Sequence, residues 1–133
     1  MPRTYTVEEA NEALPQVREL VDRIVELAPK LPEMEEQVRI ERLKSHKAGS
    51  TEDSREALAQ SVASLKSTEM AVAVAIQRLE EMEITIKGPL HYGLVDFLSY
   101  RDGELVELCW QLGEKAVEHW HRIGEGYPGR KPL

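Results

Sequence analysis

Residues 94–110 read LVDFLSYRDGELVELCW, and this stretch decides the fold of the C-terminal part of the chain. Apolar and polar side chains alternate on both sides of Asp102-Gly103, a pair typical of the type I′ turn in a β-hairpin. A two-residue turn fixes the register of the hairpin, so Val95 is predicted to lie opposite Trp110. The register places apolar side chains on one face of the hairpin: Val95, Phe97, Val106, Leu108 and Trp110.

The other face of the predicted hairpin carries the carboxylates of Asp96 and Glu107 beside Cys109. Two carboxylates near a thiol could bind a metal or take part in acid–base chemistry. They would also raise the pKa of the thiol, which argues against Cys109 as a nucleophile. The alternative is that this face simply meets solvent, in which case truncation of Asp96 should cost little stability.

The residues that follow the hairpin are predicted to form a short helix from Glu114 to Ile123. On a helix Glu114, Glu118 and His121 share one face. Glu118 and His121 also have the Glu-x-x-His spacing by which helical bundles place a carboxylate and an imidazole on one metal ion. We therefore take these three residues as candidate ligands of a divalent metal ion. The alternative is an exposed acidic face that contains a histidine.

The C-terminal tail is predicted to fold back onto the rest of the chain. Its glycines allow the chain to reverse, and its prolines limit the entropy lost on ordering. Arg130 is expected to hold one of the nearby carboxylates, because a guanidinium suits a two-pronged contact with them. These carboxylates belong to Glu107, Glu114, Glu118 and Glu125. The tail would complete a polar ligand pocket, with His121 and Trp110 near its wall; the alternative is a disordered tail.

Towards the N-terminus, Ile84–Lys87 alternates like a strand and completes a three-stranded antiparallel meander. The chain before it is helical, with predicted helices over residues 7–31, 33–47 and 53–82. The predicted fold class is therefore α+β, with long antiparallel amphipathic helices, a small β-meander and a short C-terminal helix. We expect one domain over residues 1–133, with a helical scaffold over about 6–83 and the meander and last helix over about 84–133.

The first and third predicted helices carry apolar residues at alternating spacings of three and four, the seam of a coiled coil. Thr6 and Glu9 form a capping box at the start of the first helix, and Pro15 is expected to bend or divide it. One chain offers little to cover both seams, so we expect a homodimer. The alternative is a monomer in which the meander and the second helix cover them.

Composition excludes several classes of partner. The net charge is −7, and no basic patch interrupts the acidic balance, so we expect no binding to nucleic acid or to anionic membrane surfaces. No apolar run is long enough to span a membrane. The single cysteine, Cys109, cannot form an internal disulfide, which favours a reducing compartment. We therefore predict a cytoplasmic protein.

Several short segments form a specific pattern in a fixed order along the chain. They are YTVEEAN at residues 5–11, GLVDF at 93–97, RDG at 101–103, LCW at 108–110, LGE at 112–114, WH at 120–121 and GRKPL at 129–133. This pattern resembles the prokaryotic family catalogued as domain of unknown function 2203. The resemblance implies a compact cytosolic domain and carries over no activity.

The resemblance also indicates where a site would lie, because its pattern includes polar residues near turns and chain ends that packing alone would not require. Among the residues in the pattern we predict the following as ligand-binding: Asp96, Arg101, Trp110, Glu114, His121 and Arg130.

Two functions remain open on the sequence. The first is a non-enzymatic binding or scaffold protein that acts through its helical surface and C-terminal segment, because the sequence contains no complete catalytic set. The second is a metal-binding protein or metal-dependent enzyme that uses the carboxylate and histidine cluster. Stoichiometric metal in purified protein would distinguish the second function from the first.

Overall fold

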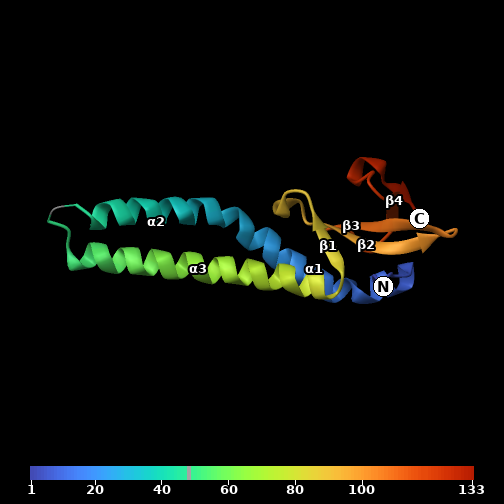
Figure 1. Ribbon diagram of the computed structural model, residues 1–133, viewed down its shortest axis with the longest axis horizontal. Helices are drawn as coiled ribbons and strands as arrows, with labels where there is room; N and C mark the ends of the chain where they lie inside the picture. The colour runs from blue at the N-terminus through green and yellow to red at the C-terminus, as the bar shows by residue number, and fades with distance from the viewer. Residues whose placement is uncertain (48) are drawn as a thin grey trace.

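The computed structural model describes residues 1–47 and 49–133, and its fold is α+β. The helices are α1 (Val7–Leu27), α2 (Leu31–Ser45) and α3 (Glu52–Glu81), with a short 3₁₀ turn, η1 (Ala28–Lys30), between α1 and α2. The antiparallel α2 and α3 form a long prong that projects from the end of the molecule that holds the sheet (Figure 1). Among the described residues, no helix is both long enough and apolar enough to cross a lipid bilayer.

The start of α1 follows from a capping box, as its sequence predicts. The Glu9 amide donates to Thr6 Oγ1 at 3.0 Å, and the Thr6 amide donates to Glu9 Oε1 at 2.9 Å. Pro15 was expected to bend or divide this helix; it does not divide it, because α1 continues unbroken through it. Proline removes one backbone hydrogen bond from the helix, and the buried apolar face on both sides of Pro15 holds the remaining turns together.

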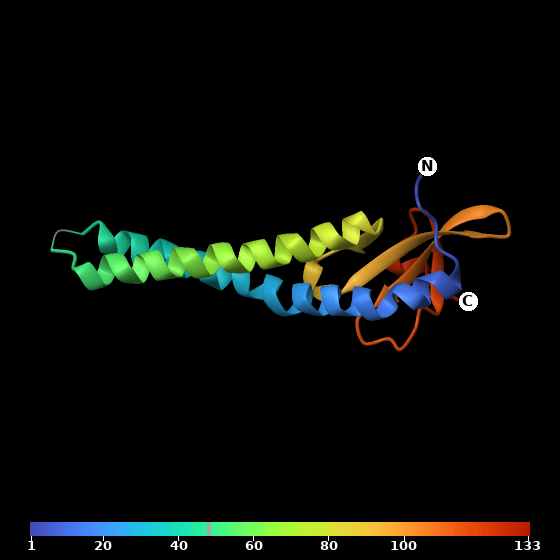
Figure 2. The same cartoon turned by 90° about the horizontal axis from the view of Figure 1, so that it is seen from below.

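The core lies between α1, the last turns of α3 and one face of the sheet (Figure 2). Val17, Val21 and Ile24 of α1 are fully buried, as are Ala75 and Leu79 of α3. The apolar seam of α1 is therefore covered within the chain, by the sheet and by α3. This part of the molecule needs no second copy to cover it.

Among the described residues, five strands form one antiparallel sheet in which each strand pairs with the next along the chain. They are β1 (Ile84–Lys87), β2 (Leu94–Arg101), β3 (Glu104–Gln111), β4 (His119–Arg122) and β5 (Lys131–Pro132). The predicted register of the central hairpin is confirmed: Val95 lies opposite Trp110, and both are completely buried. Positive φ angles at Asp102 (53°) and Gly103 (79°) agree with the predicted type I′ turn.

The predicted three-stranded meander is incomplete, and the predicted helix over residues 114–123 is wrong. Residues 114–118 form a loop with a bend, and His119–Arg122 is a strand that pairs with β3. A helix of ten residues has little stability of its own, whereas the free edge of β3 offers backbone partners to any extended segment that reaches it. The tail then adds β5 to β4 in the same way.

Gly93, immediately before β2, supports a local prediction. Its φ is +63°, and a Cβ atom there would lie 2.8 Å from Leu112 Cβ and 3.2 Å from Val25 Cγ2. Gly93→Ala should therefore lower the free energy of unfolding by about 2–4 kcal/mol, from backbone strain and overpacking together. Gly103→Ala is the control, because its φ is +79° but no atom lies within 4 Å of the added Cβ. Denaturant unfolding of both variants compares them, and equal losses would show that the contacts at Gly93 do not matter.

Candidate metal centre

The second face of the sheet is not the solvent face that its alternation suggested. Asp96, Cys109 and His121 are 3%, 0% and 1% exposed. Gly124, Gly126 and Tyr127 line a small cavity beside this face, together with Asp96 and His121. Figure 1 shows the C-terminal segment, in red, curled beside the end of the sheet. The segment that follows β4, residues 124–127, thus lies beside these buried polar residues.

Three neighbouring strands contribute one side chain each to a compact cluster. Asp96 of β2 lies directly opposite Cys109 of β3, and β4 brings His121 onto the same face. One ligand atom from each of the three residues lies within 4.8 Å of the other two. His121 Nε2 is 3.2 Å from Asp96 Oδ1. A carboxylate, a thiol and an imidazole therefore meet in a buried site.

The ring of His121 faces a hydrogen-bond acceptor at each of its nitrogens. Nδ1 lies 2.9 Å from the carbonyl oxygen of Arg122, and Nε2 faces the carboxylate of Asp96. A neutral imidazole has one N–H, so it can donate to only one of these two acceptors. The remaining ring nitrogen can approach its acceptor oxygen favourably only if a second proton or another cation lies between the two atoms. A metal ligand histidine commonly donates its second N–H to a backbone carbonyl, which is the arrangement available to Nδ1 here.

The thiol of Cys109 is protonated at neutral pH when no cation is present. Burial raises its pKa to about 12, and the charge of Asp96 adds to the effect of burial. The upward direction of this pKa shift agrees with the prediction from the sequence. Such a thiol is a poor nucleophile by itself. A metal ion would reverse the effect, because coordination to a metal deprotonates a cysteine outright.

A cavity of about 170 Å³ adjoins the cluster. Its wall includes Asp96, His121 and Tyr127, with Lys87 and Glu107 also present. Lys87 Nζ lies 3.9 Å from Glu107 Oε2, and the Glu107 side chain is 15% exposed. Two of the three cluster residues, Asp96 and His121, therefore border a space that can hold water or a very small ligand.

A second set of polar contacts holds the C-terminal tail against the turn after β3. Arg130 Nη2 donates to Glu114 Oε1 at 2.7 Å and to Oε2 at 2.9 Å, and it lies 3.0 Å from His119 Nδ1. The prediction that Arg130 folds back onto a nearby carboxylate is confirmed, although one nitrogen makes both contacts rather than two. Glu114 Oε1 also accepts the amide of Gln111 at 2.7 Å, which closes the turn.

The predicted site residues are thus divided among several places. Asp96 and His121 come together, and so do Glu114 and Arg130, whereas Trp110 lies in the core on the opposite face. Arg101 lies at the end of β2, with its guanidinium carbon 4.7 Å from the ring centroid of Trp120.

The predicted metal ligands Glu114, Glu118 and His121 do not share one face, because the helix that would align them is absent. Glu114 binds Arg130, and Glu118 is exposed in the loop before β4. Only His121 of the three enters the buried cluster among the described residues.

A family profile described as "Uncharacterized conserved protein (DUF2203)" matches residues 3–133. The chain belongs to this family. The match confirms the resemblance seen in the short segments of the sequence. No curated protein and no solved structure matched the chain. The description of DUF2203 names no activity, so a function for this member has to be argued from its own residues.

The candidate residue that sequence reasoning did not include among the metal ligands of this DUF2203 chain is Cys109. Its position opposite Asp96 was predicted correctly, and a metal was considered for the two carboxylates near the thiol, but the thiol itself was weighed only as a nucleophile. Residues 119–122 were not predicted to form a strand, and it is this strand that places His121 beside Asp96 and Cys109. The alternation His119-Trp120-His121 could have indicated that strand, because the two histidines then point to the same face as Cys109.

Proposed function

We propose that the protein binds one zinc ion through the Asp96 carboxylate, the Cys109 thiolate and Nε2 of His121. The observation that carries the proposal is the environment of the His121 ring, whose two nitrogens both face acceptors. A cation at Nε2 removes the conflict with the carboxylate, and it leaves Nδ1–H to donate to the carbonyl of Arg122.

The donor set favours zinc over the harder cations. Magnesium and calcium are bound by oxygen ligands, whereas sulfur, nitrogen and oxygen together suit zinc. Three protein ligands leave the fourth position of a tetrahedral zinc ion open, as in catalytic zinc sites. The adjoining cavity offers space for a ligand at this fourth position. A water molecule or a small anion would occupy this fourth position. The Cys109 thiol must be reduced to bind, which agrees with a cytoplasmic location.

Cobalt is the sharpest probe of this proposal, because a cysteine ligand gives Co²⁺ a sulfur charge-transfer absorption in the near ultraviolet. Protein freed of metal with a chelator should bind one Co²⁺ per chain with this absorption, and Zn²⁺ should displace it. Binding should strengthen as the pH rises, since the metal must displace the thiol proton. Both metals should raise the melting temperature, because they bind the folded state.

Variants separate this site from adventitious binding. Cys109→Ser should abolish the charge-transfer band, and His121→Gln should weaken binding by 10-fold or more, with the folded state of each checked by circular dichroism. His119→Gln is the matched control, because His119 lies two residues away on the same strand and contacts Arg130 instead. Absence of stoichiometric binding, or an unchanged absorption in Cys109→Ser, would refute the zinc site.

A second proposed role is that of a non-enzymatic binding or scaffold protein. It is supported by the prong of α2 and α3, which extends away from the sheet (Figure 1). Large apolar side chains of this prong are exposed. Leu43 and Met70 are 63% and 65% exposed. Such a surface is suited to contacts with another protein chain.

A further inference from the structure

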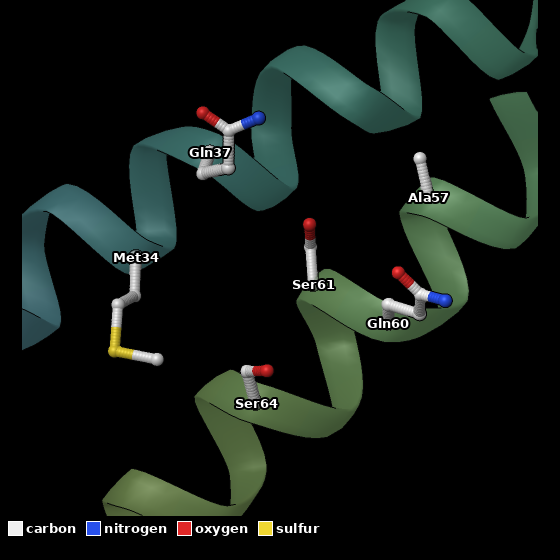
Figure 3. Close-up of a pocket in the computed structure, with 6 residues that line it drawn as sticks. All are labelled: Met34, Gln37, Ala57, Gln60, Ser61 and Ser64. Carbon is white, nitrogen blue, oxygen red and sulfur yellow. The ribbon is translucent and has the colours of Figure 1, made fainter.

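The two helices of the prong contact each other through a narrow seam. In α2, Val38 and Glu41 are the buried residues, and residues 52–71 of α3 include none that is buried. A cavity of about 370 Å³ lies between the helices. Figure 3 shows its lining, which consists of Met34 together with small or polar side chains: Gln37, Ala57, Gln60, Ser61 and Ser64. The prong therefore buries little apolar surface within one chain.

On the side away from this seam, Glu36, Ile40 and Leu43 of α2 are exposed, and the exposed Lys47 follows two residues after the end of the helix. We call these four residues the outer stripe. The spacing of four and three places Glu36, Ile40 and Leu43 in one row along the helix, and Lys47 lies beyond the end of this row. Ile40 and Leu43 are among the large apolar side chains that solvent reaches, at 37% and 63% exposure. The stripe is thus acidic at the sheet end, apolar in the middle and basic at the tip.

This order of residues is complementary to itself in the antiparallel direction. If two copies of α2 lie side by side with opposite directions, Ile40 of each copy faces Leu43 of the other. Glu36 then faces Lys47 at both ends of the contact. A two-fold symmetric interface requires this reciprocity, because the same surface must serve both copies.

We propose that the outer stripe of α2 is a self-association surface on which a second copy of this chain packs in the antiparallel direction. The contact is short compared with a standard interface of about 800 Å² per partner. The dimer is therefore weak and depends on protein concentration. High salt weakens it further, because two of its four contact pairs are ionic.

Sedimentation of the full chain over a range from micromolar to millimolar concentration tests the proposal. The mass should rise from 15.1 kDa towards twice that value as concentration increases. Leu43→Ser should keep the chain monomeric, and its melting temperature should remain unchanged because Leu43 is exposed. A wild-type chain that stays monomeric throughout the range would overturn the proposal.

Variants that reverse the charges of Glu36 and Lys47 test whether these two residues pair between antiparallel copies of α2. Glu36→Lys should weaken association about 10-fold, because it places like charges together at both ends. The double variant Glu36→Lys/Lys47→Glu should restore wild-type association by reversing each pair. Glu35→Lys is the matched control, since it makes the same charge change at an exposed position beside the stripe. Equal effects of the two single changes, with no restoration in the double variant, would reject this surface.

Discussion

Replacement of Trp110 by alanine is expected to lower the free energy of unfolding by about 3–5 kcal/mol. The indole is completely buried opposite Val95, in the core between the sheet and α1. Its Nε1 also donates to the carbonyl oxygen of Glu114 at 3.0 Å. Truncation would remove apolar contacts, leave a cavity and deprive this carbonyl of its partner.

Denaturant unfolding followed by circular dichroism measures this effect. Trp120→Ala is the matched control, because Trp120 is a half-buried tryptophan on the neighbouring part of the sheet. Trp120→Ala should lower the free energy of unfolding clearly less than Trp110→Ala does. A loss below about 1 kcal/mol for Trp110→Ala would contradict the assignment of this face as the core.

The second large effect is expected for Asp96→Ala in metal-free protein, which should lose about 3 kcal/mol. The sequence interpretation of a solvent face predicted a small loss, but Asp96 is 3% exposed and lies 3.2 Å from His121. Removal of the carboxylate would leave the imidazole buried without its partner. The loss of stability therefore comes from the His121 imidazole, which stays buried without its hydrogen-bond partner.

A double-mutant cycle isolates this contribution. His121→Ala should cost much less in the Asp96→Ala background than in the wild type, since the stranded partner is then removed as well. Glu104→Ala is the control for an exposed pair, because Glu104 and Arg122 lie 3.5 Å apart with side chains 56% and 50% exposed. That change should cost less than about 1 kcal/mol. Additive losses at Asp96 and His121 would show that the buried contact contributes nothing.

The short histidine-containing strand illustrates why the predicted alignment of Glu114, Glu118 and His121 on one helix face was wrong. The spacing of Glu114, Glu118 and His121 fits one face of a helix, but a segment of that length does not determine its own conformation. In the folded chain its backbone pairs with β3, and the strand turns His121 towards Asp96 and Cys109. Two of the three predicted ligands are consequently separated from the one that enters the cluster.

Local signals were sufficient where neighbouring residues determine the geometry. The Asp102-Gly103 turn and the alternation around it determined every cross-strand pair of the β2–β3 hairpin. The capping box likewise determined where α1 begins. In both cases the interacting groups are close in sequence, so their geometry follows from short-range backbone preferences.

Tertiary structure alone decided which residues the second face of the hairpin meets. Alternation distinguishes two faces, but it does not show that a later segment will cover the one that carries charge. The burial of Asp96 and Cys109 depends on a tail that adds two strands beyond β3 and is held there by Arg130 and Glu114. Those contacts join residues that are separated in the sequence. Their partners are the backbone groups at the edge of β3 and the carboxylate of Glu114, which are in position only once the sheet has folded.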